Sequence, residues 1–75
     1  MQYNTFIERQ PHVLAGKPVI KGTRISVEHI MRKAAQGYTI EEIVENLPHL
    51  SHEQVLAAFA FAADMIANEE IIEMT

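Results

Sequence analysis

The sequence predicts a mainly α domain, in which three helices with a helix-turn-helix (homeodomain-like) plan follow a short N-terminal β arm or hairpin. Two observations indicate this fold class. From residue 26 onward, apolar side chains recur at the three- and four-residue spacing of a helix face. Before that point, short β-favouring runs alternate with glycines and prolines. The length suits one domain, which we expect to span residues 1–75.

The β arm is expected to cover residues 1–25. Its β-favouring runs are Phe6-Ile7, Val13-Leu14, Pro18-Val19-Ile20 and Thr23-Arg24-Ile25. Lys21 and Gly22 separate the last two runs, and glycine accepts the positive φ that a tight turn requires. We therefore expect the chain to turn back on itself at Gly22.

Residues 26–37 and 39–47 predict the first two helices. Ser26 is a good N-cap residue, and Gly37 can adopt the left-handed conformation that ends a helix. Thr39 and Glu42 have the spacing of a capping box, in which each side chain accepts a hydrogen bond from the other residue's backbone N–H. Pro48 cannot continue the second helix.

Residues 51–68 predict a third, longer helix, and residues 69–75 form an acidic and apolar tail. Ser51 and Gln54 have the spacing of a second capping box. Phe59 and Phe61 point roughly 200° apart, because a helix turns about 100° per residue. Each ring therefore belongs to its own apolar stripe, and two short helices are too small to cover both stripes.

A second copy of the chain would cover the stripe that contains Phe61. The interface that we expect consists of Ala58, Phe61, Met65 and Ile72. A two-fold dimer is the simplest arrangement that brings this surface together in two copies. The alternative is an intramolecular core that leaves one phenylalanine exposed, since single exposed apolar residues are common.

Charge is distributed unevenly along the chain. Residues 1–33 hold all six Lys and Arg against two carboxylates, a net charge of +4, whereas residues 34–75 hold eight carboxylates and no Lys or Arg, a net charge of -8. A basic surface can meet a phosphate backbone, and an acidic surface suits a basic protein partner. The residues expected to contact DNA are Lys17, Lys21, Arg24, Arg32, Lys33 and Gln54. The alternative is that these cations are ordinary solvated surface charge.

No catalytic, metal or cofactor site is expected. The chain has no cysteine, and His49 and His52 lie three residues apart without an evident third ligand. The carboxylates of Glu41, Glu42 and Glu45 lie on a solvated helix face, without a cleft that would raise a pKa. Nowhere do eighteen apolar residues follow one another, and no signal peptide is evident at the N-terminus. We therefore expect a cytoplasmic protein that binds neither a membrane nor a small-molecule substrate.

The run Gly-Lys-Pro-Val-Ile-Lys-Gly-Thr-Arg-Ile from Gly16 to Ile25 resembles a signature of the bacterial family known as domain of unknown function family 433. Gly37, Ile40-Glu41-Glu42-Ile43 and Pro48-His49-Leu50 extend the resemblance, which covers about Tyr3 to Ile66. The resemblance implies a homeodomain-like helix-turn-helix with an N-terminal β arm. It also implies an antitoxin-like role, in which many members are encoded beside a PIN-like ribonuclease toxin.

The expected function is therefore that of a dimeric antitoxin-like module that binds such a toxin and also its own operator DNA. The alternative is a protein–protein interaction domain with no role in nucleic-acid binding. In either case, the expected partner is a macromolecule or a second copy of the chain.

Overall fold

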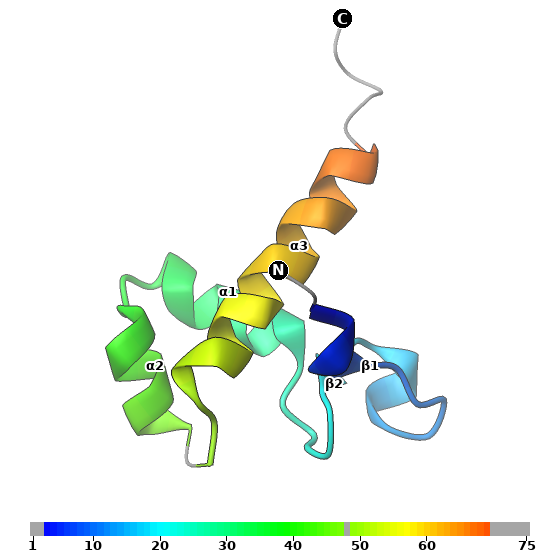
Figure 1. The fold of residues 1–75 in the computed structure, drawn as a ribbon, viewed down its shortest axis with the longest axis horizontal. Coiled ribbons are helices and arrows are strands. Elements are labelled where there is room, and N and C mark those ends of the chain that lie inside the picture. Colours follow the sequence, from blue (N-terminus) through cyan, green and yellow to red (C-terminus); the bar gives the residue numbers. More distant parts are fainter. Residues whose placement is uncertain (1–2, 48, 70–75) are drawn as a thin grey trace, which may run out of the picture.

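The computed structural model describes residues 3–47 and 49–69, and it shows a mainly helical chain with a small antiparallel sheet. Two 3-10 turns and two strands precede three helices (Figure 1). In chain order the elements are η1 (Tyr3–Thr5), β1 (Ile7–Glu8), η2 (Leu14–Gly16), β2 (Val19–Ile20), α1 (Val27–Ala35), α2 (Ile40–Asn46) and α3 (His52–Glu69). No helix in this described part of the chain is both long and apolar enough to cross a membrane.

The sheet pairs segments that lie far apart within the arm. β1 and β2 are antiparallel, with Ile7 opposite Ile20 and Glu8 opposite Val19. The chain turns back at Gly22, as expected, where φ is 81°. After the turn, Ser26 forms an antiparallel bridge with Val19, and the Ile20 N–H donates to the Ile25 carbonyl at 2.9 Å and the Val27 N–H to the Pro18 carbonyl at 3.0 Å. The pairing of β2 with β1 exists beside this contact and was not expected.

The Thr23 side chain helps to hold the turn at Gly22. Its hydroxyl donates to the Ile20 carbonyl at 2.8 Å and accepts from the Ile25 N–H at 2.9 Å. The Thr23 N–H also donates to the Ile20 carbonyl at 3.0 Å. The turn is therefore held by both the side chain and the backbone of Thr23.

The side chains expected to cap the first two helices do so in the structure. The Ser26 hydroxyl accepts from the His29 N–H at 2.9 Å, and Gly37 adopts a φ of 100° just beyond α1. At α2, the Thr39 hydroxyl accepts from the Glu42 N–H at 3.1 Å, while the Glu42 carboxylate accepts from the Thr39 N–H at 2.8 Å. These bonds satisfy backbone donors that have no partner inside the helix.

The third helix begins with a second capping box. The Ser51 hydroxyl accepts from the Gln54 N–H at 3.1 Å, and the Gln54 side-chain oxygen accepts from the Ser51 N–H at 2.7 Å. Pro48, which was expected to stop the second helix, lies outside the described residues, and α2 itself ends at Asn46. The two capping boxes thus set the starts of α2 and α3.

The core lies where the sheet and all three helices meet. Its largest fully buried side chains are Ile20, Ile30, Ile43, Val19 and Val55. Complete burial of one such side chain stabilises a fold by roughly 1.5 to 3 kcal/mol. The helices α1 and α2 contact α3, and so do η1 and β1 from the arm. The end of α3 extends beyond these neighbours, as Figure 1 shows.

Candidate interaction surfaces

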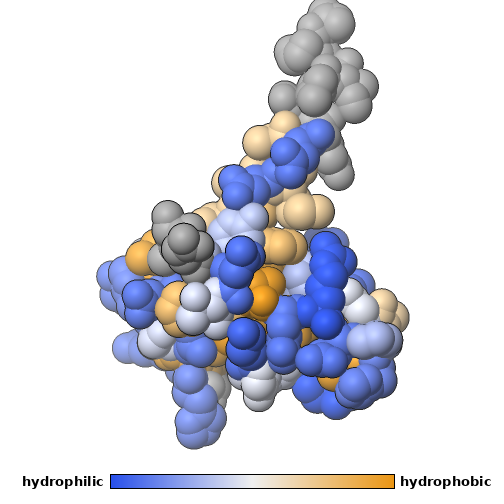
Figure 2. Space-filling view, turned by 45° about the vertical axis from the view of Figure 1, so that its right-hand side comes forward, coloured by the Kyte–Doolittle hydropathy of each residue, from blue (hydrophilic) through white to orange (hydrophobic). Residues whose placement is uncertain are grey.

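Large apolar side chains are exposed on α3 at Leu56 and, to a greater extent, near its C-terminal end. Met65 is 39% exposed and Ile66 is 65% exposed. With the partly buried Ala62 they have the i, i+3, i+4 spacing of one helix face. We call these three residues the distal face of α3. Figure 2 shows hydrophobic residues on this projecting part of α3, beside hydrophilic ones.

The residues of the expected dimer interface lie in different settings in the single chain. Ala58 is completely buried in the core of the single chain, so it cannot form an exposed surface for a second copy. Phe61 is partly buried and packs against the core. Of the other two expected residues, Met65 belongs to the distal face, while Ile72 lies outside the described residues.

The N-terminal arm covers Phe61. The rings of Tyr3 and Phe61 meet edge to face, with their centroids 5.3 Å apart and their planes at 85°. The guanidinium carbon of Arg9 lies 5.9 Å from the centroid of the Phe61 ring. The helical pattern of α3 carried no information on this cover, although Tyr3 near the start of the chain was an aromatic residue to which no contact was assigned.

Asp64 adds a polar contact beside this aromatic pair. Hydrogen bonding to its carboxylate raises the pKa of the Tyr3 phenol above the ordinary value of 10.0, because the bond stabilises the protonated hydroxyl. Partial desolvation and the negative charge of Asp64 act in the same direction. The carboxylate of Asp64 thus lies near the Tyr3 hydroxyl, beside the aromatic contact between the arm and α3.

Two of the cations expected to contact DNA share one carboxylate. Lys17 Nζ lies 2.8 Å from Glu28 Oε1, and Arg32 Nη2 lies 3.0 Å from Glu28 Oε2. Hydrogen bonds from Lys17 and then Arg32 hold the pKa of Glu28 below its ordinary value of 4.5. Glu28 therefore reduces the positive potential that this part of the surface would offer to a phosphate.

The other expected DNA contacts lie in three different settings. Lys21 and Arg24 are exposed in the turn after β2, where no described carboxylate pairs with them. Lys33 Nζ lies 4.8 Å from the centroid of the Tyr38 ring. The Gln54 side-chain oxygen is used in the capping box of α3. The structure therefore brings Lys21 and Arg24 together but does not bring all six residues into one site.

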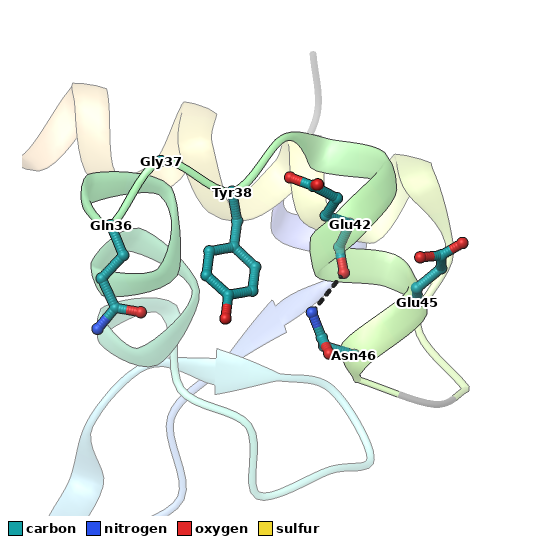
Figure 3. A pocket seen from close by; sticks show the side chains of 6 residues that line it. All are labelled: Gln36, Gly37, Tyr38, Glu42, Glu45 and Asn46. Carbon is teal, nitrogen blue, oxygen red and sulfur yellow. Dashed lines mark hydrogen bonds between the residues drawn. The ribbon is translucent and has the colours of Figure 1, made fainter.

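An open groove of about 430 Å³ separates the end of α1 from α2 (Figure 3). Its lining residues are Gln36, Gly37, Tyr38, Glu42, Glu45 and Asn46. Figure 3 shows the Tyr38 ring between the two helices. The groove corrects the expectation that Glu42 and Glu45 lie on a helix face without a cleft. A tyrosine between a helix-ending glycine and an N-cap threonine was the one local signal.

The histidines do not form a metal centre within the described residues. His52 Nε2 lies 3.8 Å from Glu41 Oε2, and both side chains are exposed. Throughout residues 3–47 and 49–69, no three metal-ligating side chains gather in one group. The His52 and Glu41 contact therefore joins α2 to α3 at the surface.

Comparison with known proteins places the chain in a family. Residues 7–62 match the family model described as a protein of unknown function (DUF433). The chain is also 32% identical over 56 residues to the uncharacterized protein y4eO of Sinorhizobium fredii (strain NBRC 101917 / NGR234). That match covers 75% of this chain and 25% of the relative, so the matched region spans about a quarter of the relative's length. No solved structure matches. Because the family model covers most of the chain and includes its strands and the greater part of its helices, the chain belongs to the DUF433 family.

Proposed function

We propose that this chain is an antitoxin-like binding module that forms a dimer through the distal face of α3 and binds a protein partner through its acidic half. The homeodomain-like helix-turn-helix plan is part of the proposal, and it is supported by the packing of α1 and α2 on α3. The observation that carries the proposal is the exposure of Met65 and Ile66 at the end of α3, which extends beyond the other elements of the fold (Figure 1).

A second copy of the chain is the occupant that best fits this face. The face adjoins the buried Ala58 through its own partly buried member Ala62, so it extends the core to the surface. Stable protein interfaces bury about 800 Å² on each partner, which is roughly a sixth of the 4994 Å² that this chain exposes. The distal face would form the apolar centre of such an interface, and polar groups beside it would form the rim.

Replacement of Ile66 by glutamate tests the dimer. A charge in the centre of an apolar interface loses its water without gaining a partner, so Ile66→Glu is expected to sediment as a single copy. The unaltered chain is expected to sediment at micromolar concentration with twice its mass of 8.5 kDa. Ala67→Glu is the control, because Ala67 is exposed and lies on the other side of the same helix turn.

Two results would contradict the proposed dimer. A dimeric Ile66→Glu variant, or an unaltered chain that sediments as one copy, would rule out this interface. Circular dichroism of both variants checks that they remain helical, since neither position lies in the core.

The proposed protein partner is a PIN-like ribonuclease toxin. Two features support it: the family resemblance implies such a toxin, and residues 34–75 carry only negative formal charge. An acidic surface suits a basic RNA-binding enzyme, because electrostatic complementarity accelerates and orients association. Added to a PIN-like ribonuclease encoded beside its gene, the chain is expected to suppress RNA cleavage; unaltered cleavage would contradict the antitoxin role.

Operator DNA is a second candidate partner, and the exposure of Lys21 and Arg24 in one turn favours it. Two observations oppose it. Glu28 pairs with Lys17 and Arg32, and the first turn of α3, which would read bases in a helix-turn-helix, contains Glu53 and a Gln54 whose oxygen is already used. A protein partner is therefore the leading proposal.

A further inference from the structure

The groove between α1 and α2 offers several hydrogen-bond acceptors to a ligand. The Asn46 side-chain N–H donates to the Glu42 backbone carbonyl at 2.9 Å (Figure 3), which leaves the Asn46 side-chain oxygen as an acceptor. One Glu42 carboxylate oxygen accepts from the Thr39 N–H, so its second oxygen can accept from a ligand. Glu45 adds another exposed carboxylate to the lining. The groove is therefore rich in acceptors.

These acceptors are held in place before any ligand arrives. The capping box restrains Glu42, and the bond to the helix backbone restrains Asn46. A side chain that is already ordered loses little conformational entropy when it binds, which favours affinity. A ligand that suits the groove must bring several donors and positive charge.

The Tyr38 ring supplies a flat apolar wall beside the acceptors. The side chain is 37% exposed, and Figure 3 shows its ring in the space between Gln36 and Asn46. The ring already attracts a cation of the chain itself, since Lys33 Nζ lies 4.8 Å from its centroid. A ligand cation would therefore displace the Lys33 ammonium or stack on the other face of the ring. An aromatic face beside carboxylate and amide oxygens matches a guanidinium, which is planar, charged and carries five N–H donors.

We propose that this groove binds an arginine side chain of a partner protein, with the guanidinium stacked on Tyr38 and hydrogen-bonded to Glu42, Glu45 and Asn46. This proposal rests on the proposed function in one respect: the arginine belongs to the protein that the acidic half binds. The proposal does not depend on whether the chain is a dimer.

Titration with the capped amino acid Nα-acetyl-arginine amide tests the site by nuclear magnetic resonance. The expected result is saturable shifts of the backbone amide signals of Gly37, Tyr38 and Asn46. Nα-acetyl-citrulline amide has nearly the same shape without the charge, and it is expected to produce no saturable shift. The matching lysine derivative is expected to bind more weakly, because an ammonium lacks the planar fork of donors.

The double variant Glu42→Gln with Glu45→Gln removes the charge from the groove. Glutamine at position 42 can still complete the capping box, so α2 is expected to keep its start. Arginine binding is expected to weaken at least about tenfold, since two charged hydrogen bonds are lost. Glu41→Gln with Glu53→Gln is the control, because it removes the same charge from residues that do not line the groove.

Each outcome decides the inference. Equal binding of arginine and citrulline, equal binding of arginine and lysine, or full retention of binding in the Glu42 and Glu45 variant would overturn it, as would the absence of any saturable shift. Sedimentation of the same variant is expected to match the unaltered chain, so loss of the arginine site and loss of the dimer are separate results.

Discussion

Glu28 joins two basic residues that the sequence places far apart. Lys17 precedes β2 and Arg32 lies in the last turn of α1, yet both approach the same carboxylate. All three side chains are about half exposed or more, so water and salt screen the attraction. The contact therefore orients the arm on α1 and contributes only weakly to stability.

Glu28→Gln is expected to lower the stability at neutral pH and to have less effect in acid. Because the folded chain lowers the pKa of Glu28 below 4.5, its stabilising contribution is present above that pH. The contribution is lost as the pH falls through the lowered pKa. Urea denaturation at neutral pH and at about pH 2 measures the difference between variant and unaltered chain.

The control for Glu28 is Glu45→Gln. Glu45 is exposed on α2 and forms no ion pair among the described residues, so it removes the same charge without breaking a bridge. A difference between the Glu28 variant and the unaltered chain that stayed constant with pH would contradict the assigned role.

Gln54 caps the start of α3, although its residue type also suits the recognition of a DNA base. Its type and position agree with base reading and with helix capping, and sequence alone supported both. In the structure its oxygen accepts from the Ser51 N–H at 2.7 Å. Gln54 would have to break this hydrogen bond before its side-chain oxygen could contact a base.

At the scale of elements, the arm stabilises the fold by covering the middle of α3. Tyr3 and Phe61 come from opposite ends of the described chain, and their edge-to-face contact holds η1 against the helix. Contacts of this kind stabilise a fold by about 0.5 to 1.5 kcal/mol beyond the area that they bury. The arm is thus part of the core.

A double-mutant cycle between Tyr3→Ala and Phe61→Ala tests this contact. The expected coupling free energy, measured by urea denaturation of the two single variants and the double variant, is about 0.5 to 1.5 kcal/mol. A cycle between Tyr38→Ala and Phe61→Ala is the control, and its coupling is expected to be near zero because Tyr38 lies beside the groove. Equal coupling in both cycles would show that the Tyr3 contact has no specific role.

At the scale of the whole molecule, charge separates the two candidate partners. The cations of residues 1–33 and the carboxylates of residues 34–75 cannot serve the same ligand. A phosphate backbone would have to meet the turn that contains Lys21 and Arg24, whereas a basic protein would meet α2 and the described part of α3. The two forms of binding therefore respond to different substitutions.

Lys21→Gln with Arg24→Gln tests DNA binding. If the turn contacts two phosphates, operator DNA is expected to bind more weakly, and the slope of log affinity against log salt is expected to fall in magnitude by about 2. Ala63→Glu with Ala67→Glu is the control, because it gives the same net charge by changing exposed positions of α3. Equal weakening in both variants would point to net charge alone, and unaltered binding would exclude the turn.

The helix order and the helix starts were determined by the sequence itself. Ser26, the Thr39 and Glu42 pair, and the Ser51 and Gln54 pair all cap as their types and spacing predict. A cap depends on residues no more than three positions apart, so the local sequence contains all the information that it requires.

Only the tertiary structure decided which surfaces are covered. The pairing of β1 with β2, the cover of Phe61 by Tyr3 and the groove beside Tyr38 each depend on segments brought together by the fold. Periodicity shows that a helix face is apolar, but it does not show which part of the chain packs against it. At the end of α3, Met65 and Ile66 are therefore exposed, because the arm reaches Phe61 and leaves these two residues uncovered.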